Sequence, residues 1–127
     1  MNTGGMTRIR KKVLEKVTSS ENPITADEIY RSLYKHANLA TIYRALNWLE
    51  DAGYITSIAF GSGPRYFFPK ARHYHFLICE VCGKIQAVKE CHLASSKADL
   101  EEHYGFIVLD HVLYFKGICK DCKKVRR

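Results

Sequence analysis

The sequence predicts an α+β protein made of two parts, and three observations carry this prediction. Helical periodicity runs through the first fifty residues, a two-residue period follows it, and all five cysteines lie after residue 78. The 127 residues, 46% hydrophobic and 26% charged, have the composition of a globular protein with one domain or two small ones. We expect domains at residues 1–68 and 73–127, joined by a hinge at residues 69–72.

The first two helices are predicted from periodicity and capping. The segment MTRIRKKVLEKV places apolar residues at helical spacing, namely Ile9, Val13, Leu14 and Val17. The second helix follows Pro23 and begins at a capping box, in which Thr25 and Glu28 stand three residues apart. Each helix therefore has an apolar side that must pack against another element.

The segment NLATIYRALNWLEDAG predicts the third helix. Asn38 can cap its first turn, and Gly53 can end it. Its buried stripe is expected to consist of Ile42, Ala45, Leu46 and Leu49. The segments YITSIAF and RYFF then read as two strands around the turn GSGP. Three helices and a hairpin in this order are typical of a winged helix, whose third helix enters the DNA major groove.

The charge of the chain fits a nucleic-acid partner. Its net charge is +7 and its isoelectric point is about 9.2. Residues off the apolar stripe of the third helix are candidates to reach base edges, namely Ala40, Thr41, Tyr43 and Arg44. Candidates to contact phosphate are Arg10, Lys11, Lys12 and Arg65. The alternative is structural: Tyr43 packs on the domain and Arg44 makes a surface ion pair.

Cysteine spacing predicts a zinc site in the second half. Cys79 and Cys82 form one C-x-x-C pair, Cys119 and Cys122 form another, and 36 residues separate the two pairs. Two such pairs can direct four thiolates at one tetrahedral ion, and four thiolates without an open position describe a structural site. A redox function would need only one pair, usually followed by a helix.

Between the two pairs the pattern reads strand, strand, helix, strand. The strands are HFLIC, KIQAV and a long FIVLDHVLYF, and the helix spans about residues 92–104. Apolar strands in so small a domain need covering, so we expect this half to form a homodimer.

These segments together resemble the ferric uptake regulator (Fur) family. The resemblance rests on LATIYRALNWLEDAGYI, PRYFF, LICEVCGKI and HVLYFKGIC-x-x-C, and it extends from Thr7 to Cys122. It implies a homodimeric, metal-dependent repressor with an N-terminal winged helix and a C-terminal dimerisation domain. It also implies DNA contacts from the third helix and structural zinc at the four paired cysteines.

The resemblance also shows where this chain departs from the family. Family members carry a sensing site between the domains, built from histidines and carboxylates. When the LIC segment of this chain is aligned with the LIC segment of family members, none of the positions of that site holds an expected metal ligand. These positions are Pro23, Phe67, Tyr74, Phe76 and Ala87. A bulge in FLIC would instead return His73 and His75 to that site.

A second family site falls on His73, His75 and His111, while its glutamate position holds Ala94. Cys91 or His92, one turn earlier, could supply the fourth ligand. His73 and His75 share one strand face because the side-chain period of a strand is two. Three imidazoles with a thiolate or a fourth imidazole favour zinc, whereas iron and manganese sites recruit more carboxylate. The alternative is that His111 is a core histidine.

The function expected from the sequence is metal-responsive repression at a pseudo-palindromic operator in double-stranded DNA, with zinc as the sensed metal and iron or manganese as the alternatives. A structural-zinc regulator that responds through the Cys91 thiol is a further alternative. A zinc hydrolase is disfavoured because no general base accompanies the histidines. Neither a membrane span nor a secretory signal is evident, so we expect a cytoplasmic protein.

Overall fold

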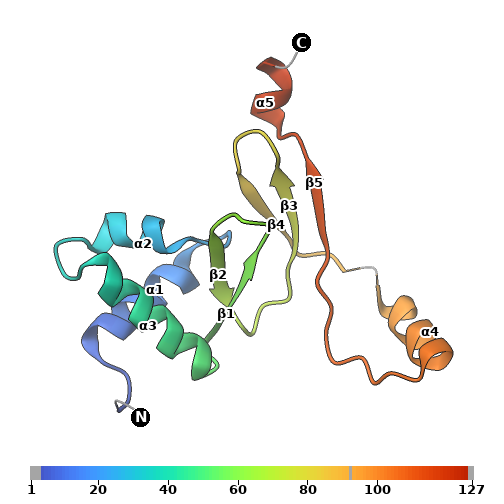
Figure 1. Ribbon diagram of the computed structural model, residues 1–127, viewed down its shortest axis with the longest axis horizontal. Coiled ribbons are helices and arrows are strands. Elements are labelled where there is room, and N and C mark those ends of the chain that lie inside the picture. The colour runs from blue at the N-terminus through green and yellow to red at the C-terminus, as the bar shows by residue number, and fades with distance from the viewer. Residues whose placement is uncertain (1–3, 92, 126–127) are drawn as a thin grey trace. The chain divides into compact units, whose positions relative to one another are not determined.

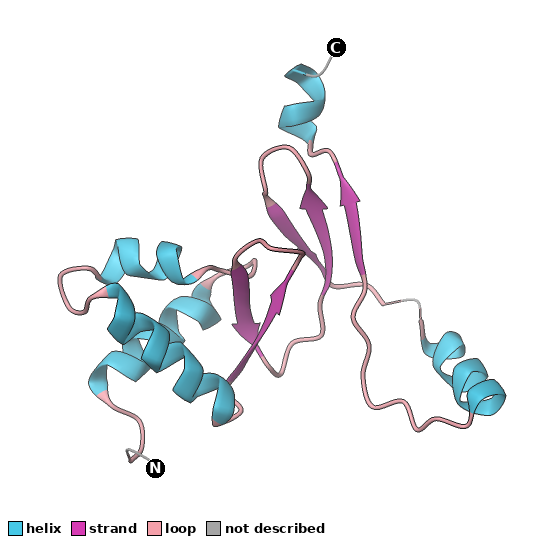
Figure 2. Ribbon diagram, in the orientation of Figure 1, coloured by secondary structure: helices cyan, strands magenta, loops and turns pink. Residues whose placement is uncertain are grey.

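The computed structural model describes residues 4–91 and 93–125, and the chain divides into two compact units at residues 72 and 73. Figure 1 labels the helices and strands, and Figure 2 separates them by type. Helices and strands occur in both units, as an α+β fold requires. Among the described residues, no helix is long and apolar enough to cross a membrane.

Three capped helices build the N-terminal unit: α1 (Arg8–Ser19), α2 (Ala26–Leu33) and α3 (Leu39–Asp51). The side chains of Thr7, Thr25 and Asn38 accept hydrogen bonds from backbone N–H groups in the first turns, and Thr25 with Glu28 forms the predicted capping box. Each cap satisfies a donor that a helix start otherwise leaves unpaired. The helix starts therefore agree with the sequence patterns.

A hairpin of β1 (Ile55–Ala59) and β2 (Arg65–Pro69) follows α3. The two strands are antiparallel, with Ile55 opposite Pro69 and Ala59 opposite Arg65. Ile24, before α2, pairs with Phe67 through two backbone hydrogen bonds of 2.8 and 3.0 Å, which ties the hairpin to the helices. Three helices and a hairpin in this order form the predicted winged helix.

One apolar core fills this unit. The core receives side chains from all three helices and both strands, and the whole stripe predicted for α3 lies in it. Its fully enclosed members include Val13, Ile29, Ile42, Leu46, Leu49 and Phe67. Burial of this many large side chains supplies the main favourable free energy of a small domain.

The C-terminal unit holds a three-stranded sheet in the order β4-β3-β5. Its elements are β3 (His75–Cys79), β4 (Ile85–Val88), α4 (Ala94–Tyr104), β5 (Tyr114–Gly117) and α5 (Lys120–Val125). β3 runs antiparallel to β4 and parallel to β5, which therefore forms an edge of the sheet. α5 was not expected from the sequence, which reads there as a charged tail.

Two expectations for this unit need correction. The helix begins at Ala94 and not at His92, and His92 lies outside the described residues. The expected strand FIVLDHVLYF is paired only at its end, where β5 begins at Tyr114. Tyr114 stands opposite Phe76, next to the first residue of β3, so the preceding residues have no strand to pair with.

Candidate metal centres and helix α3

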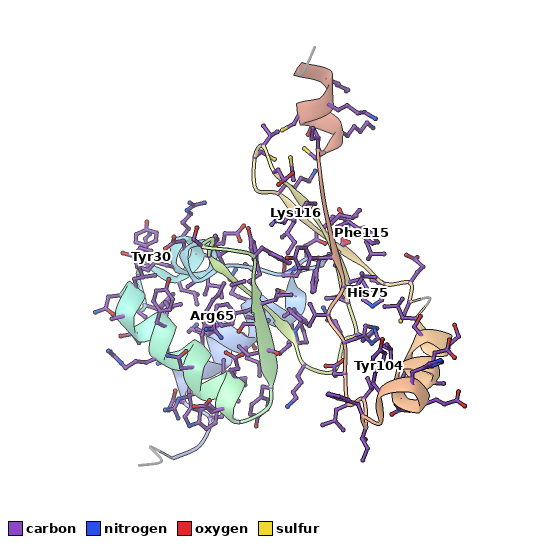
Figure 3. The ribbon with its side chains drawn as sticks, turned by 45° about the vertical axis from the view of Figure 1, so that its right-hand side comes forward. Tyr30, Arg65, His75, Tyr104, Phe115 and Lys116 are labelled. Carbon is purple, nitrogen blue, oxygen red and sulfur yellow. The ribbon has the colours of Figure 1, made fainter. Side chains whose placement is uncertain are left out.

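The four paired cysteines come together at one end of the sheet. Cys79 ends β3, Cys82 lies in the turn that follows it, Cys119 follows β5, and Cys122 lies in α5. Their four Sγ atoms lie within 4.8 Å of one another, and those of Cys82 and Cys119 are 3.7 Å apart. A tetrahedral ion with Zn–S bonds of about 2.3 Å would place its sulfurs about 3.8 Å apart. In Figure 3 the sulfur atoms gather between the β3–β4 turn and α5.

The backbone around Cys79 favours its thiolate form. Cys79 Sγ accepts hydrogen bonds from the N–H groups of Cys119 at 3.3 Å, Val81 at 3.4 Å and Cys82 at 3.5 Å. The N–H groups of Cys119 and Cys82 lower the pKa of the Cys79 thiol to about 6. The hydrogen bond with the Cys119 side chain raises the pKa of Cys122 to about 12. Four thiols in this arrangement fit a structural zinc ion, which binds them as thiolates.

A second group, here called the His–Cys cluster, consists of His73, His75, Cys91 and His111. His75 begins β3 and is 4% exposed, while His73 precedes it. Cys91 lies between β4 and α4, and His111 lies between α4 and β5. Because these residues come from three places along the chain, the fold of this unit is what brings them together.

The distances in the His–Cys cluster suit a four-coordinate ion. The Nε2 atoms of His73 and His75 are 3.2 Å apart, and those of His75 and His111 are 2.9 Å apart. Cys91 Sγ lies 3.6 Å from His111 Nε2. Zinc bonds of about 2.0 Å to nitrogen and 2.3 Å to sulfur would give N–N and N–S edges of about 3.3 and 3.5 Å in a tetrahedral site. Three nitrogens and one sulfur therefore fit zinc, with Cys91 in the place of the fourth ligand.

The positions that the resemblance assigns to an interdomain site hold apolar and aromatic residues here. Phe67 is 1% exposed within the core of the N-terminal unit. In the C-terminal unit, Phe76 is 2% exposed, pairs with Ala87 across the sheet, and contacts the ring of Tyr74. The ladder from His75 to Ile78 runs without interruption, so β3 contains no bulge of the kind that would change the register.

Helix α3 presents the residues that the sequence pattern singled out. Ala40, Tyr43 and Arg44 are exposed, and Thr41 is half-buried. Arg44 Nη2 donates a hydrogen bond of 3.1 Å to Thr41 Oγ1. Tyr43 is 44% exposed, so it lies outside the buried core of the unit.

The four phosphate candidates differ in how they are held. Lys11 is exposed and Lys12 half-buried. The Arg10 guanidinium lies over the ring of Trp48, 4.2 Å from its centroid, and donates a hydrogen bond of 2.6 Å to the Gly5 carbonyl. Such a cation–π contact restrains Arg10 within its own unit.

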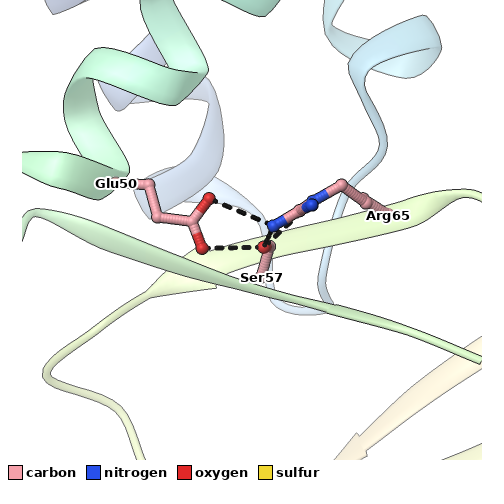
Figure 4. A network of polar contacts seen from close by, with 3 residues as sticks. All are labelled: Glu50, Ser57 and Arg65. Atoms are coloured by element: carbon pink, nitrogen blue, oxygen red, sulfur yellow. Dashed lines mark hydrogen bonds and ion pairs between the residues drawn. The ribbon is translucent and has the colours of Figure 1, made fainter.

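Arg65 belongs to a network that the sequence analysis missed (Figure 4). Its guanidinium donates to Ser57 Oγ at 2.7 and 3.2 Å and lies 3.5 Å from a Glu50 carboxylate oxygen. Ser57 in turn donates to Glu50 at 2.8 Å. The network joins α3, β1 and β2, and the opposite charges of Glu50 and Arg65 were its only signal in the sequence.

Comparison with known proteins agrees with this architecture. Residues 4–116 match the family model described as the ferric uptake regulator family. The chain is 32% identical to the ferric uptake regulation protein of Campylobacter jejuni, an alignment that covers 94% of this chain and 81% of the relative. It is 34% identical to the peroxide-responsive repressor PerR of Staphylococcus epidermidis, over 91% and 79% of the two chains.

Among solved structures, the ferric uptake regulator of Vibrio cholerae superposes with a TM-score of 0.76 and 30% identity, over 91% of this chain and 92% of that one. The family model spans most of the chain, including the winged helix and the second unit as far as residue 116. The chain therefore belongs to the ferric uptake regulator family.

Proposed function

We propose that this protein is a metal-responsive transcriptional repressor that binds double-stranded DNA as a homodimer and senses zinc through the His–Cys cluster. Residues 1–68 would read DNA, residues 73–127 would pair the chains, and residues 69–72 would join them. One observation carries the proposal. This member of the family has both a winged helix and a cluster of three imidazoles and one thiol, which is separate from the four paired cysteines.

The choice of zinc rests on the chemistry of the ligands. The cluster offers three imidazoles and one thiol, and it contains no carboxylate. Thiolate and imidazole suit zinc, whereas manganese and ferrous iron sites generally recruit oxygen ligands. When bound, a zinc ion would supply a fixed tetrahedral coordination to residues far apart in the sequence. Iron remains the alternative metal, because relatives of this chain are named ferric uptake regulation proteins.

The DNA contacts are proposed from exposure and charge. The exposed residues of α3 stand near the N-terminal end of the helix, the part that reaches base edges in winged helices. Arg44 can donate twice to a guanine, and Tyr43 can contact a thymine methyl group or a phosphate. Lys11 and Lys12 are the phosphate contacts best supported, since Arg10 and Arg65 have partners within the unit.

Homodimer formation is proposed from the C-terminal unit. Among the described residues, only this unit has a series of exposed large apolar side chains close together in the sequence, from Phe106 through Leu109 to Phe115. An accumulation of exposed large apolar side chains in one unit is typical of an interface with another chain. Two identical winged helices would also match the two halves of a pseudo-palindromic site.

The first experiment measures zinc per chain, after mild chelation and again after zinc is restored. Wild type is expected to rise from one zinc to two, because the four-thiolate site resists chelation longer than the more exposed cluster. His73→Ala should hold one zinc under both conditions. His103→Ala is the matched control: it lies on α4 outside the cluster and should behave as wild type. A single zinc that never rises in wild type would remove the zinc-sensing proposal.

A second experiment tests DNA recognition. DNA sites selected from a random pool by the zinc-loaded protein are titrated by fluorescence anisotropy at several salt and zinc concentrations. Arg44→Ala should weaken the free energy of DNA binding by about 1–3 kcal/mol and relax the base preference at one base pair in each half-site. Lys11→Ala should weaken binding to all DNA sequences alike. It should also reduce the slope of log affinity against log salt concentration by about 1 for each chain. Binding that is unaffected by zinc, or by Arg44→Ala, would contradict the proposal.

A further inference from the structure

A groove in the N-terminal unit, here called the basic groove, lies between the start of α1 and the turn that joins α2 to α3. It has a volume of about 630 Å³ and is lined by Thr7, Arg8, Ile9, Lys12 and His36. Figure 1 shows both segments on the same side of this unit. Among the described residues, no acidic side chain lines the groove. A guanidinium, an ammonium, an imidazole and a hydroxyl group are the donors that an anion requires.

Backbone hydrogen bonds fix both walls of the basic groove. On one side, Thr7 caps α1, because its Oγ1 accepts the N–H of Arg10 at 3.3 Å. On the other side, the N–H of His36 donates to the Leu33 carbonyl at 2.8 Å, which closes the turn after α2. The groove therefore exists before any ligand arrives, and little ordering is needed to fill it.

The basic side chains of the groove have no carboxylate to neutralise them. Arg8 and Lys12 stand four residues apart, so they lie on the same side of α1. Arg8 and His36 are exposed, and Lys12 is half-buried. Among the described residues, no ion pair joins any of these three side chains to an acidic one. Like charges at this spacing destabilise a helix, and an anion bound between them would remove that cost.

The basic groove lies next to the residues proposed to read DNA. His36 stands two residues before Asn38, the cap of α3. α1 packs against α3 through the shared apolar core, so the groove and the first turns of α3 keep one geometry. Residues 29–49 contain no acidic residue, so nothing in this segment repels a phosphate. Phosphate contacts beside a recognition helix fix its register on the duplex.

We propose that the basic groove binds a phosphate of the DNA backbone beside the bases that α3 reads, and that His36 makes this contact dependent on pH. The inference rests on the proposed function, because the phosphate belongs to the bound DNA. Arg8 and Lys12 supply permanent positive charge, while His36 adds charge only when its imidazole is protonated. Histidine ordinarily titrates between about pH 5 and 8, so DNA affinity should fall as the pH rises through that range.

The charged groups around His36 leave this role to a phosphate. Those that line the groove with it are Arg8 and Lys12 of α1. Lys35 precedes it in the turn, with its Nζ 5.9 Å from the centre of the Tyr34 ring. All three neighbours are cations. Because no carboxylate lines the groove, a bound phosphate is the group that would stabilise the protonated imidazole.

The first test measures the affinity of the zinc-loaded full chain for its selected DNA site at several salt concentrations. Arg8→Gln should reduce the slope of log affinity against log salt concentration by about 1 for each chain. Arg31→Gln is the matched control, because it removes an exposed arginine of α2 that does not line the groove. It should keep the slope of wild type. Equal slopes for wild type and Arg8→Gln would overturn the assignment.

The second test compares DNA affinity at pH 6 and pH 8 with zinc in excess. The ratio of the two affinities should be about 1.5- to 5-fold larger for each chain in wild type than in His36→Gln, the range of an exposed ion pair. His36→Lys stays charged, so it should have the small ratio of His36→Gln and the higher affinity of wild type at pH 6. The His–Cys cluster is intact in all three proteins, so any effect of pH on zinc binding cancels. Identical pH profiles for wild type and His36→Gln would show that His36 does not contact DNA.

A third measurement tests the other source of phosphate. Inorganic phosphate is titrated into the full chain without DNA and followed by nuclear magnetic resonance. If Arg8→Gln abolishes its binding and leaves the DNA salt slope unchanged, the groove takes free phosphate and the assignment to DNA is wrong. If zinc controls DNA binding while every groove variant behaves as wild type, the groove is wrong and the proposed function stands. If wild type binds no DNA, both fail.

Discussion

The two units of this chain are stabilised in different ways. The N-terminal unit has a core of eleven buried apolar residues drawn from all of its helices and strands. Among the described residues of the C-terminal unit, only Tyr74, His75, Phe76, Cys79 and Ile85 are buried, and ten large apolar side chains are exposed. One unit buries its own apolar surface, while the other leaves most of its large apolar side chains exposed.

The difference follows from size and from what each segment contributes. Residues 73–127 form a unit of 55 residues, near the lower limit at which a chain can stabilise itself by apolar burial alone. Two groups of side chains that could hold a metal ion lie in that unit, and the described part of the N-terminal unit has none. The comparison predicts that a change of the same kind will have different consequences in the two units.

The largest effect is expected from the loss of one of the four thiolates. A structural zinc ion contributes on the order of 10 kcal/mol to folding, so Cys119→Ser should unfold the C-terminal unit while the winged helix persists. Hydrogen exchange should show protection lost in β3 and β5 and kept in α1 and α3. Glu80→Gln, an exposed change between Cys79 and Cys82, should leave the pattern of wild type. Simultaneous loss of both units would contradict the comparison.

The next effect in size separates a core leucine of the N-terminal unit from a leucine of α4. Leu46 is fully buried in the N-terminal core, and Leu46→Ala should lower the free energy of unfolding of that unit by about 2–5 kcal/mol. Leu100 on α4 is 49% exposed, and Leu100→Ala should change stability by less than about 0.5 kcal/mol in the monomer. Urea denaturation followed by circular dichroism measures both. Equal costs for the two variants would show that α4 is packed.

A smaller effect is expected at the start of α3. Asn38 Oδ1 accepts the N–H of Thr41 at 2.8 Å, so Asn38→Ala should cost about 1 kcal/mol of stability in the N-terminal unit. The same change should weaken DNA binding, because the proposed contact residues lie in that first turn. Asn47→Ala, an exposed position later in the helix, is the matched control and should do neither. Thermal unfolding and anisotropy titrations separate the two consequences.

The smallest effect is expected in the network of Figure 4. The Arg65 side chain is 60% exposed, and ion pairs in such positions are worth between 0 and about 1 kcal/mol. Glu50→Gln should therefore lower stability by less than about 1 kcal/mol. Asp51→Asn makes the same charge change at the next residue, where it faces solvent, and it corrects for the overall charge. A cost well above this range would mean that the network positions the hairpin.

The sequence predicted the two units unequally. In the N-terminal unit, the caps, stripes and turn are local signals, and each agrees with the structure from Thr25 to Gly53. In the C-terminal unit, the prediction of one long strand, FIVLDHVLYF, was wrong except at its end. A strand needs a neighbouring strand to pair with, and the spacing of apolar residues does not reveal where that neighbour ends. The choice between Cys91 and His92 also stayed open in the sequence. It depends on the path of the chain between β4 and α4, which brings Cys91 next to His111.

The indole of Trp48 has an optical consequence. Trp48 is the only tryptophan of the chain, and it lies in α3 with Arg10 over its ring and Tyr54 stacked beside it at 6.2 Å. Indole emission therefore comes from the winged helix alone, and it is sensitive to the guanidinium that covers the ring. A ligand that draws Arg10 toward itself would change the colour or yield of that emission. The protein thus carries an internal fluorophore that reports on the N-terminal unit, which is proposed to read DNA. The C-terminal unit contains no tryptophan and contributes no indole emission.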